Sequence, residues 1–201
     1  MLKLFGLAVT AVLGIAVGGL SALWMSGLTG GSGFPFSDVE VRGWASDWSI
    51  GSAAAGPYTR ARVARHGLLA LTKSEAVYFM TATDSEGRAL SEDCTYAMTG
   101  GRQPAAWWSI TLYDALSRLP MNTDGALSID HSQLNDLDTW EAVISATRPE
   151  DGRLWLSSRN AGAFDLTLRL YRPDGDLLDA PEAQLNPPEI KRLTCRSNEN
   201  G

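Results

Sequence analysis

The sequence has 201 residues, of which 44% are hydrophobic and 20% are charged, and this composition excludes a disordered chain. Its formal net charge is −6. Because an acidic protein repels phosphate backbones and the sequence contains no basic stripe, we expect no nucleic-acid partner.

An uncharged apolar stretch covers residues 4–25, directly after Lys3. An α-helix rises about 1.5 Å per residue, so about 20 residues cross a hydrocarbon layer about 30 Å thick. The positive flank favours keeping the N-terminus in the cytoplasm. We therefore expect residues 4–25 to form a transmembrane helix that anchors the chain in a membrane and places the rest on the outer, oxidising side.

A cleaved signal peptide is the alternative interpretation of the same stretch, because the small residues 16–18 suit a signal peptidase. The apolar stretch continues to Met25, beyond the usual length of a signal core, and this favours an uncleaved anchor. The Gly-rich residues 27–33 follow as a flexible tether. The chain is thus divided into a signal anchor with its tether, residues 1–33, and an exported domain, residues 34–201.

The segment 57–67 predicts a short helix, with Pro57 suited to the first turn and Gly67 to the end. Its arginines, Arg60, Arg62 and Arg65, form a basic face. The simpler interpretation of this face is that it is solvated; the alternative is that it approaches anionic lipid headgroups.

After this helix the hydrophobic pattern changes to a period of two, which is typical of strands. A turn-forming sequence at residues 148–152 predicts that the two strands on either side of it form a hairpin. Short strands separated by turns favour a β-sandwich. The expected strands are 76–83, 107–113, 140–147, 153–157 and 164–171.

The clearest of these strands is 164–171, in which alternate residues are apolar. This pattern indicates a half-buried antiparallel strand with one polar face. On that polar face we expect Asp165 and Arg169 to form cross-strand ion pairs.

Cys94 and Cys195 are the only cysteines in the sequence. An oxidising compartment favours their pairing, so we expect a disulfide that ties the C-terminal segment to the body of the domain. Two cysteines and two histidines far apart in the sequence do not form a zinc signature, and no metal is expected.

No catalytic motif emerges from the sequence. Residues 130–132 read Asp-His-Ser, but catalytic triads are assembled from separated positions, and no nucleophile elbow or dinucleotide-binding glycine motif is present. Asp114 and Asp130 lie near strand ends and are the best candidates for a pair of glycosidase carboxylates, although nothing in their spacing selects them. We assign no catalytic residue and no cofactor.

Aromatic residues offer a more informative pattern, because several alternate with the apolar positions of their strands. Trp and Tyr side chains on an open sheet face can stack on sugar rings or anchor a protein partner. If a helix or a second sheet covers that face, the same rings belong to the core. The candidate binding residues are Trp107, Tyr113, Trp155 and Tyr171.

Several short motifs occur together along the chain. They are Pro57-Tyr58 with Arg60-Ala61, Lys73-x-Glu75-Ala76-x-Tyr78, Cys94-x-Tyr96, Trp107-Trp108-Ser109-x-Thr111-Leu112-Tyr113-Asp114, Leu166-x-Leu168-Arg169-Leu170-Tyr171 and Pro188-x-Ile190-Lys191-Arg192. On these motifs, residues 43–195 resemble the bacterial family called domain of unknown function 1214, in its short, membrane-anchored form.

The resemblance implies a jelly-roll-like antiparallel β-sandwich in the envelope of a Gram-negative bacterium, with cysteines at the positions of Cys94 and Cys195. It brings no established catalytic residues. We thus expect an all-β domain with one short helix, preceded by a single N-terminal transmembrane helix. The helix would cross the inner membrane once, with the C-terminal domain in the periplasm.

The expected function is that of a non-enzymatic envelope module, which binds a glycan or a protein partner through the open sheet face. Two alternatives remain. One is a carbohydrate-active hydrolase that uses two carboxylates, and the other is a scaffold subunit of a membrane assembly.

Overall fold

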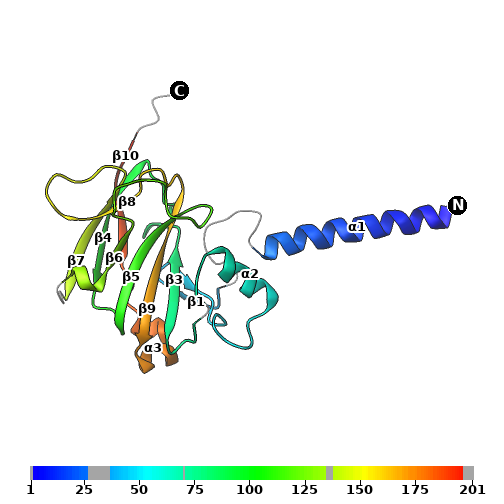
Figure 1. The fold of residues 1–201 in the computed structure, drawn as a ribbon, viewed down its shortest axis with the longest axis horizontal. Helices are drawn as coiled ribbons and strands as arrows, with labels where there is room; N and C mark the ends of the chain where they lie inside the picture. The colour runs from blue at the N-terminus through cyan, green and yellow to red at the C-terminus, as the bar shows by residue number, and fades with distance from the viewer. Residues whose placement is uncertain (1, 27–36, 70, 135–137, 197–201) are drawn as a thin grey trace.

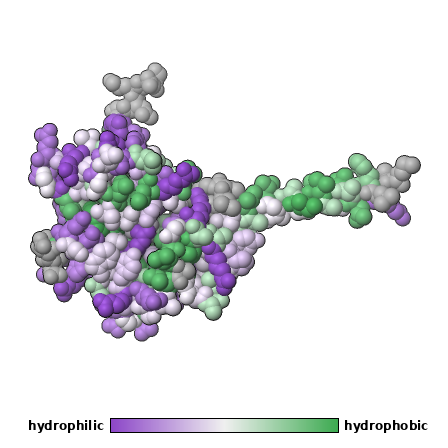
Figure 2. Space-filling view, in the orientation of Figure 1, coloured by the Kyte–Doolittle hydropathy of each residue, from purple (hydrophilic) through white to green (hydrophobic). Residues whose placement is uncertain are grey.

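The computed structural model describes residues 2–26, 37–69, 71–134 and 138–196, so the expected tether at residues 27–33 lies outside the described residues. Helix α1, Leu2–Met25, extends away from the rest of the protein (Figure 1). Its residues Phe5–Met25 are long and apolar enough to cross a membrane, and none of that segment is buried. Figure 2 shows hydrophobic residues along α1, whereas the visible face of the domain is mixed. An apolar N-terminal helix is therefore confirmed, with the properties of either an anchor or a signal sequence.

The first of two sheets has six strands, and all of its pairings are antiparallel. At its centre the two longest strands pair along their whole length, with Ile110 opposite Leu168. Three of the expected strands, 76–83, 107–113 and 164–171, are confirmed in this sheet. In spatial order the strands are β1 (Val39–Val41), β2 (Trp44–Ser46), β3 (Ala76–Thr81), β9 (Phe164–Pro173), β5 (Ala105–Asp114) and β6 (Ser128–Asp130).

The second sheet has four strands, in the order β10 (Glu189–Cys195), β4 (Cys94–Gly101), β7 (Thr139–Ser145) and β8 (Leu154–Ser157). The predicted hairpin between β7 and β8 is wrong, because these strands are parallel, with Val143 beside Trp155. The eight residues 146–153 carry the chain back along β7, so that β8 begins beside Ala142. Alternation shows which side chains face inward but is the same for either strand direction, so the pattern could not distinguish the two pairings.

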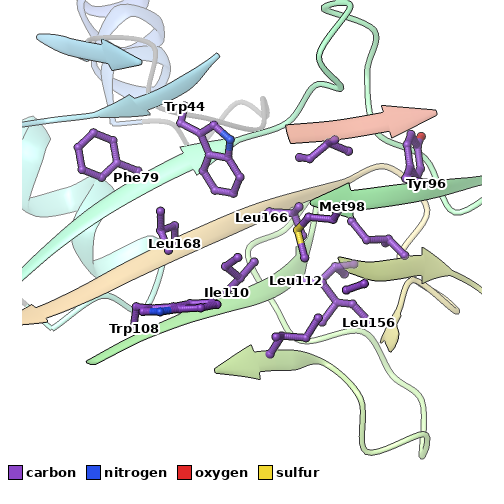
Figure 3. Packing of buried hydrophobic residues seen from close by; sticks show 14 of the residues in the cluster. Trp44, Phe79, Tyr96, Met98, Trp108, Ile110, Leu112, Leu156, Leu166 and Leu168 are labelled. Carbon is purple, nitrogen blue, oxygen red and sulfur yellow. The ribbon is translucent and has the colours of Figure 1, made fainter. Parts of the chain in front are cut away.

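The two sheets pack face to face over one hydrophobic core, which confirms the sandwich. Alternate residues of β5 and β9 are fully buried on the inner face, as their alternation predicted. Figure 3 shows Ile110, Leu112 and Leu168 in the same buried cluster as Met98 and Leu156 of the second sheet. The central strands are therefore fixed by burial of their inward residues.

Helix α2, Pro57–Arg65, agrees with the predicted short helix and lies outside the sandwich, beside β3. It buries Val63 against Tyr78 and Met80 of β3, which extends a small second cluster over part of the outer sheet face. Two helices were not predicted, α3 (Gly175–Asp179) and α4 (Pro181–Gln184). Each is too short to show a helical period in the sequence.

A disulfide joins Cys94 and Cys195, as predicted. The two cysteines are directly opposite each other on the neighbouring strands β4 and β10. Their bond closes a loop across a sequence separation of 101 and ties the last strand to the sheet.

Candidate functional site

The structure places three of the four candidate aromatic residues on one outer sheet face. Trp107 and Tyr171 are directly opposite each other on β5 and β9, and their ring centroids lie 5.3 Å apart. Tyr113 is on the same outer face, six residues further along β5. All three side chains are partly exposed. The aromatics thus occupy an outer sheet face with accessible surface at both ends.

Trp155 does not belong to this group. It lies on β8 in the other sheet, is only 8% exposed, and donates a hydrogen bond from Nε1 to the carbonyl oxygen of Ser145. The Arg148 guanidinium covers its ring at 5.3 Å from the centroid. The alternation correctly predicted that the Trp155 side chain points away from the core, on the other side of β8 from its inward-facing residues. It could not show to which sheet this strand belongs.

We call the outer face of β5 and β9 the aromatic face. The strand register places its members in four opposed pairs, with the aromatic residues at the two ends and polar residues in the middle. The pairs are Trp107 with Tyr171, Ser109 with Arg169, Thr111 with Thr167, and Tyr113 with Asp165.

Arg169 and Tyr113 form the second accessible part of the aromatic face. Arg169 donates a hydrogen bond from Nη2 to the Tyr113 hydroxyl at 2.6 Å, and its guanidinium lies 5.4 Å from the centre of that ring. Since Arg169 starts opposite Ser109, the two side chains meet over the middle pair, Thr111 and Thr167, which is buried. The expected ion pair of Arg169 is therefore replaced by a hydrogen bond and a cation–π contact.

Asp165 is the unusual polar group of this face. It is 1% exposed, and its Oδ1 has no hydrogen-bond partner within the described part of the chain. Burial, followed by the negative charge of Asp114, raises the pKa of Asp165 to about 7, although Arg65 and Arg169 act in the opposite direction. At neutral pH this carboxyl is therefore close to its titration midpoint. The sequence predicted an ion pair here because alternation does not distinguish a buried aspartate from an exposed one.

Comparison with protein families identifies the domain that carries this face. The model of the family described as protein of unknown function (DUF1214) matches residues 75–175, which is half of the chain. The chain belongs to this family. The matched segment runs from just before β3 to just after β9 and contains every residue of the aromatic face.

One solved structure shows this fold within a larger protein. The VPA0106 protein from Vibrio parahaemolyticus superposes on 70% of this DUF1214 chain with a TM-score of 0.53 and 23% sequence identity. An uncharacterised protein from Burkholderia cenocepacia covers 62% of the chain, with 21% identity and a TM-score of 0.35. The chain corresponds to 36% and 31% of these two proteins, about a third of their length. No curated protein matches it.

The two carboxylates proposed for hydrolysis are both engaged in local turns of the DUF1214 domain. Asp114 Oδ1 accepts hydrogen bonds from the backbone nitrogens of Leu116 and Arg118. Asp130 Oδ1 accepts one from the backbone nitrogen of Ser132 and caps the short 3-10 helix η1, His131–Gln133. Both carboxylates therefore stabilise chain turns.

The positions of these carboxylates along the sheet also disfavour a shared reaction. Asp130 is opposite Ser109, five residues before Asp114 on β5. At about 3.3 Å per residue their backbones are about 17 Å apart, beyond the roughly 5–9.5 Å that separates glycosidase carboxylates. The Ser132 hydroxyl accepts a hydrogen bond from Trp107 Nε1, so the Asp-His-Ser sequence supports the aromatic face. Among the residues that the structure describes, no three His, Cys, Asp or Glu side chains are grouped so that they could hold a metal ion.

Proposed function

We propose that this chain is a non-enzymatic module of the bacterial envelope, which binds a glycan through its aromatic face. In this proposal α1 spans the inner membrane and the β-sandwich lies in the periplasm. The unburied apolar surface of α1, the positive flank at Lys3 and the Cys94–Cys195 disulfide support that placement.

The partly exposed Trp107–Tyr171 pair is the observation on which glycan binding rests. The faces of aromatic rings pack against the C–H faces of sugars, and Arg169 with Tyr113 offers hydrogen-bond donors for sugar hydroxyl or carboxylate groups. From Trp107 to Tyr113 the face extends about 20 Å along the strands. This length suits a short oligosaccharide better than a single sugar.

Titration of the full chain in detergent with peptidoglycan fragments and envelope polysaccharides tests this proposal. Trp107→Ala is expected to weaken binding by up to about tenfold, since contact with one aromatic ring contributes about 0.5–1.5 kcal/mol. Trp48→Ala is the matched control, because Trp48 is also a partly exposed tryptophan but lies outside the aromatic face.

A cooperative unfolding transition with an unchanged far-ultraviolet circular dichroism spectrum shows that a variant is still folded. Glycan binding that survives Trp107→Ala would refute the aromatic face as the site. If no glycan binds and a protein instead co-purifies in a Trp107-dependent manner, the face binds a protein partner and the glycan proposal is wrong.

A further inference from the structure

The C-terminal end of α1 is attached to α2 through Arg62. This arginine is buried and donates a hydrogen bond from Nη1 to the Met25 carbonyl oxygen at 3.0 Å, while Nη2 contacts Asp47 Oδ2 at 3.2 Å. The last carbonyl groups of a helix carry partial negative charge and interact favourably with a cation. Arg62 therefore keeps α2 beside the point at which α1 leaves the lipid.

A second contact connects α2 to the loop 115–121 that follows β5. One turn after Arg62, the Arg65 guanidinium approaches the Ala115 carbonyl oxygen at 3.5 Å. The loop itself is held by hydrogen bonds from its backbone to Asp114 and from the Asn160 side chain to the Met121 carbonyl oxygen. The end of α1, helix α2 and this loop thus form one continuous surface, and Figure 1 shows α2 and the end of α1 on the same side of the sandwich.

This surface combines exposed hydrophobic side chains with positive charge. Outside α1, five large hydrophobic side chains in the described part of the chain are largely exposed, and three of them are in this loop. They are Leu116, Leu119 and Met121, with exposed fractions of 57%, 49% and 87%. Arg118 of the loop is exposed among these apolar side chains, on an otherwise acidic protein. Apolar side chains flanked by basic ones are typical of surfaces that enter the headgroup layer of anionic membranes.

We infer that α2 and the loop 115–121 form a docking surface for anionic phospholipid, which holds the domain against the bilayer that contains α1. The inference rests on the membrane anchor of the proposed function and is independent of glycan binding. The side chains at positions 116, 119 and 121 enter the headgroup layer, and Arg118 contacts lipid phosphates.

The disulfide makes a direct test possible, because the protein has no free cysteine. The full chain carrying Met121→Cys is labelled with an environment-sensitive fluorophore and reconstituted into phosphatidylcholine vesicles with or without phosphatidylglycerol. Leu193→Cys is the matched control, since Leu193 is also a largely exposed apolar residue, 52% exposed, but lies on β10. We expect a blue-shifted emission and quenching by nitroxide-labelled lipid at position 121 only, and more strongly when phosphatidylglycerol is present.

A charge variant tests the role of Arg118. Arg118→Gln in the Met121→Cys background is expected to lower the docked-to-undocked ratio about fivefold, the effect of one basic side chain near an anionic surface. Flotation of the same vesicles after alkaline extraction reports separately on the anchor. Loss of flotation would overturn the anchor and with it the inference. Retained flotation with a water-exposed probe at position 121 would overturn the docking surface alone.

Discussion

Replacing Asp165 by asparagine is expected to change how the stability of the domain depends on pH. The native pKa of about 7 is above the ordinary value of 3.8, so between these values the folded state holds a proton that the unfolded state has lost. Stability conferred by the protonated carboxyl is therefore complete below about pH 4, declines as the pH rises, and is lost above about pH 7. At about 1.36 kcal/mol per pKa unit, the total decline is on the order of 4 kcal/mol.

An asparagine side chain is neutral at every pH, so Asp165→Asn removes this decline. We expect the variant to unfold at a higher guanidinium concentration than the native protein at pH 8, with the difference disappearing towards pH 4. The measurement is chemical denaturation of the full chain in detergent at a series of pH values. The lowered pKa values of Asp47, Asp84 and His66 affect both proteins equally and cancel in the difference.

Asp179→Asn makes the same chemical change at an exposed carboxylate of α3 and is the matched control. It should leave the pH profile unchanged. If the native protein and Asp165→Asn lose stability in parallel from pH 4 to pH 8, then Asp165 is ionised in the folded state at little cost. Burial would then not raise the pKa of Asp165.

Two further predictions concern the covalent link and the core. Reduction of the disulfide, or the double variant Cys94→Ser with Cys195→Ser, is expected to lower the free energy of unfolding by up to about 4.7 kcal/mol on the chain-entropy model; denaturation curves identical with and without reductant would contradict this. Leu168→Ala removes a fully buried side chain and should cost about 2–5 kcal/mol in the same assay. The exposed Leu193→Ala should remain within about 0.5 kcal/mol of the native protein, and equal effects of the two variants would show that the inward face of β9 is misassigned.

The sequence predicted those parts of the fold in which local pattern and burial agree. The central strands β5 and β9 are long enough for their alternation to identify an inward and an outward face, and both faces are confirmed. Pro57 and Gly67 likewise marked the helix that became α2. The three-residue strand β6 is too short to show a period and was not predicted.

What escaped prediction depends on contacts between segments that are distant in the sequence. Arg62 was expected on an exposed basic face, but it is buried because Asp47 and the end of α1 supply its partners. Trp155 was grouped with Trp107 because both face outward, although their strands belong to different sheets. Asp165 has the ordinary appearance of a polar residue in an alternating strand, and only its tertiary surroundings give it an altered pKa.

With α1 as the proposed anchor, the position of the disulfide has a mechanical consequence. The bond closes a covalent ring from Cys94 to Cys195, and β1, β2, β3 and α2 lie outside this ring. A pulling force transmitted through α1 would reach these elements first and could peel them from the sheet one after another. When the opposing force acts beyond Cys195, unfolding would then stop at Cys94, because the force passes through the disulfide and bypasses the ring. A stretched molecule would therefore lose α2 and the first three strands while β4 to β10 remain covalently enclosed.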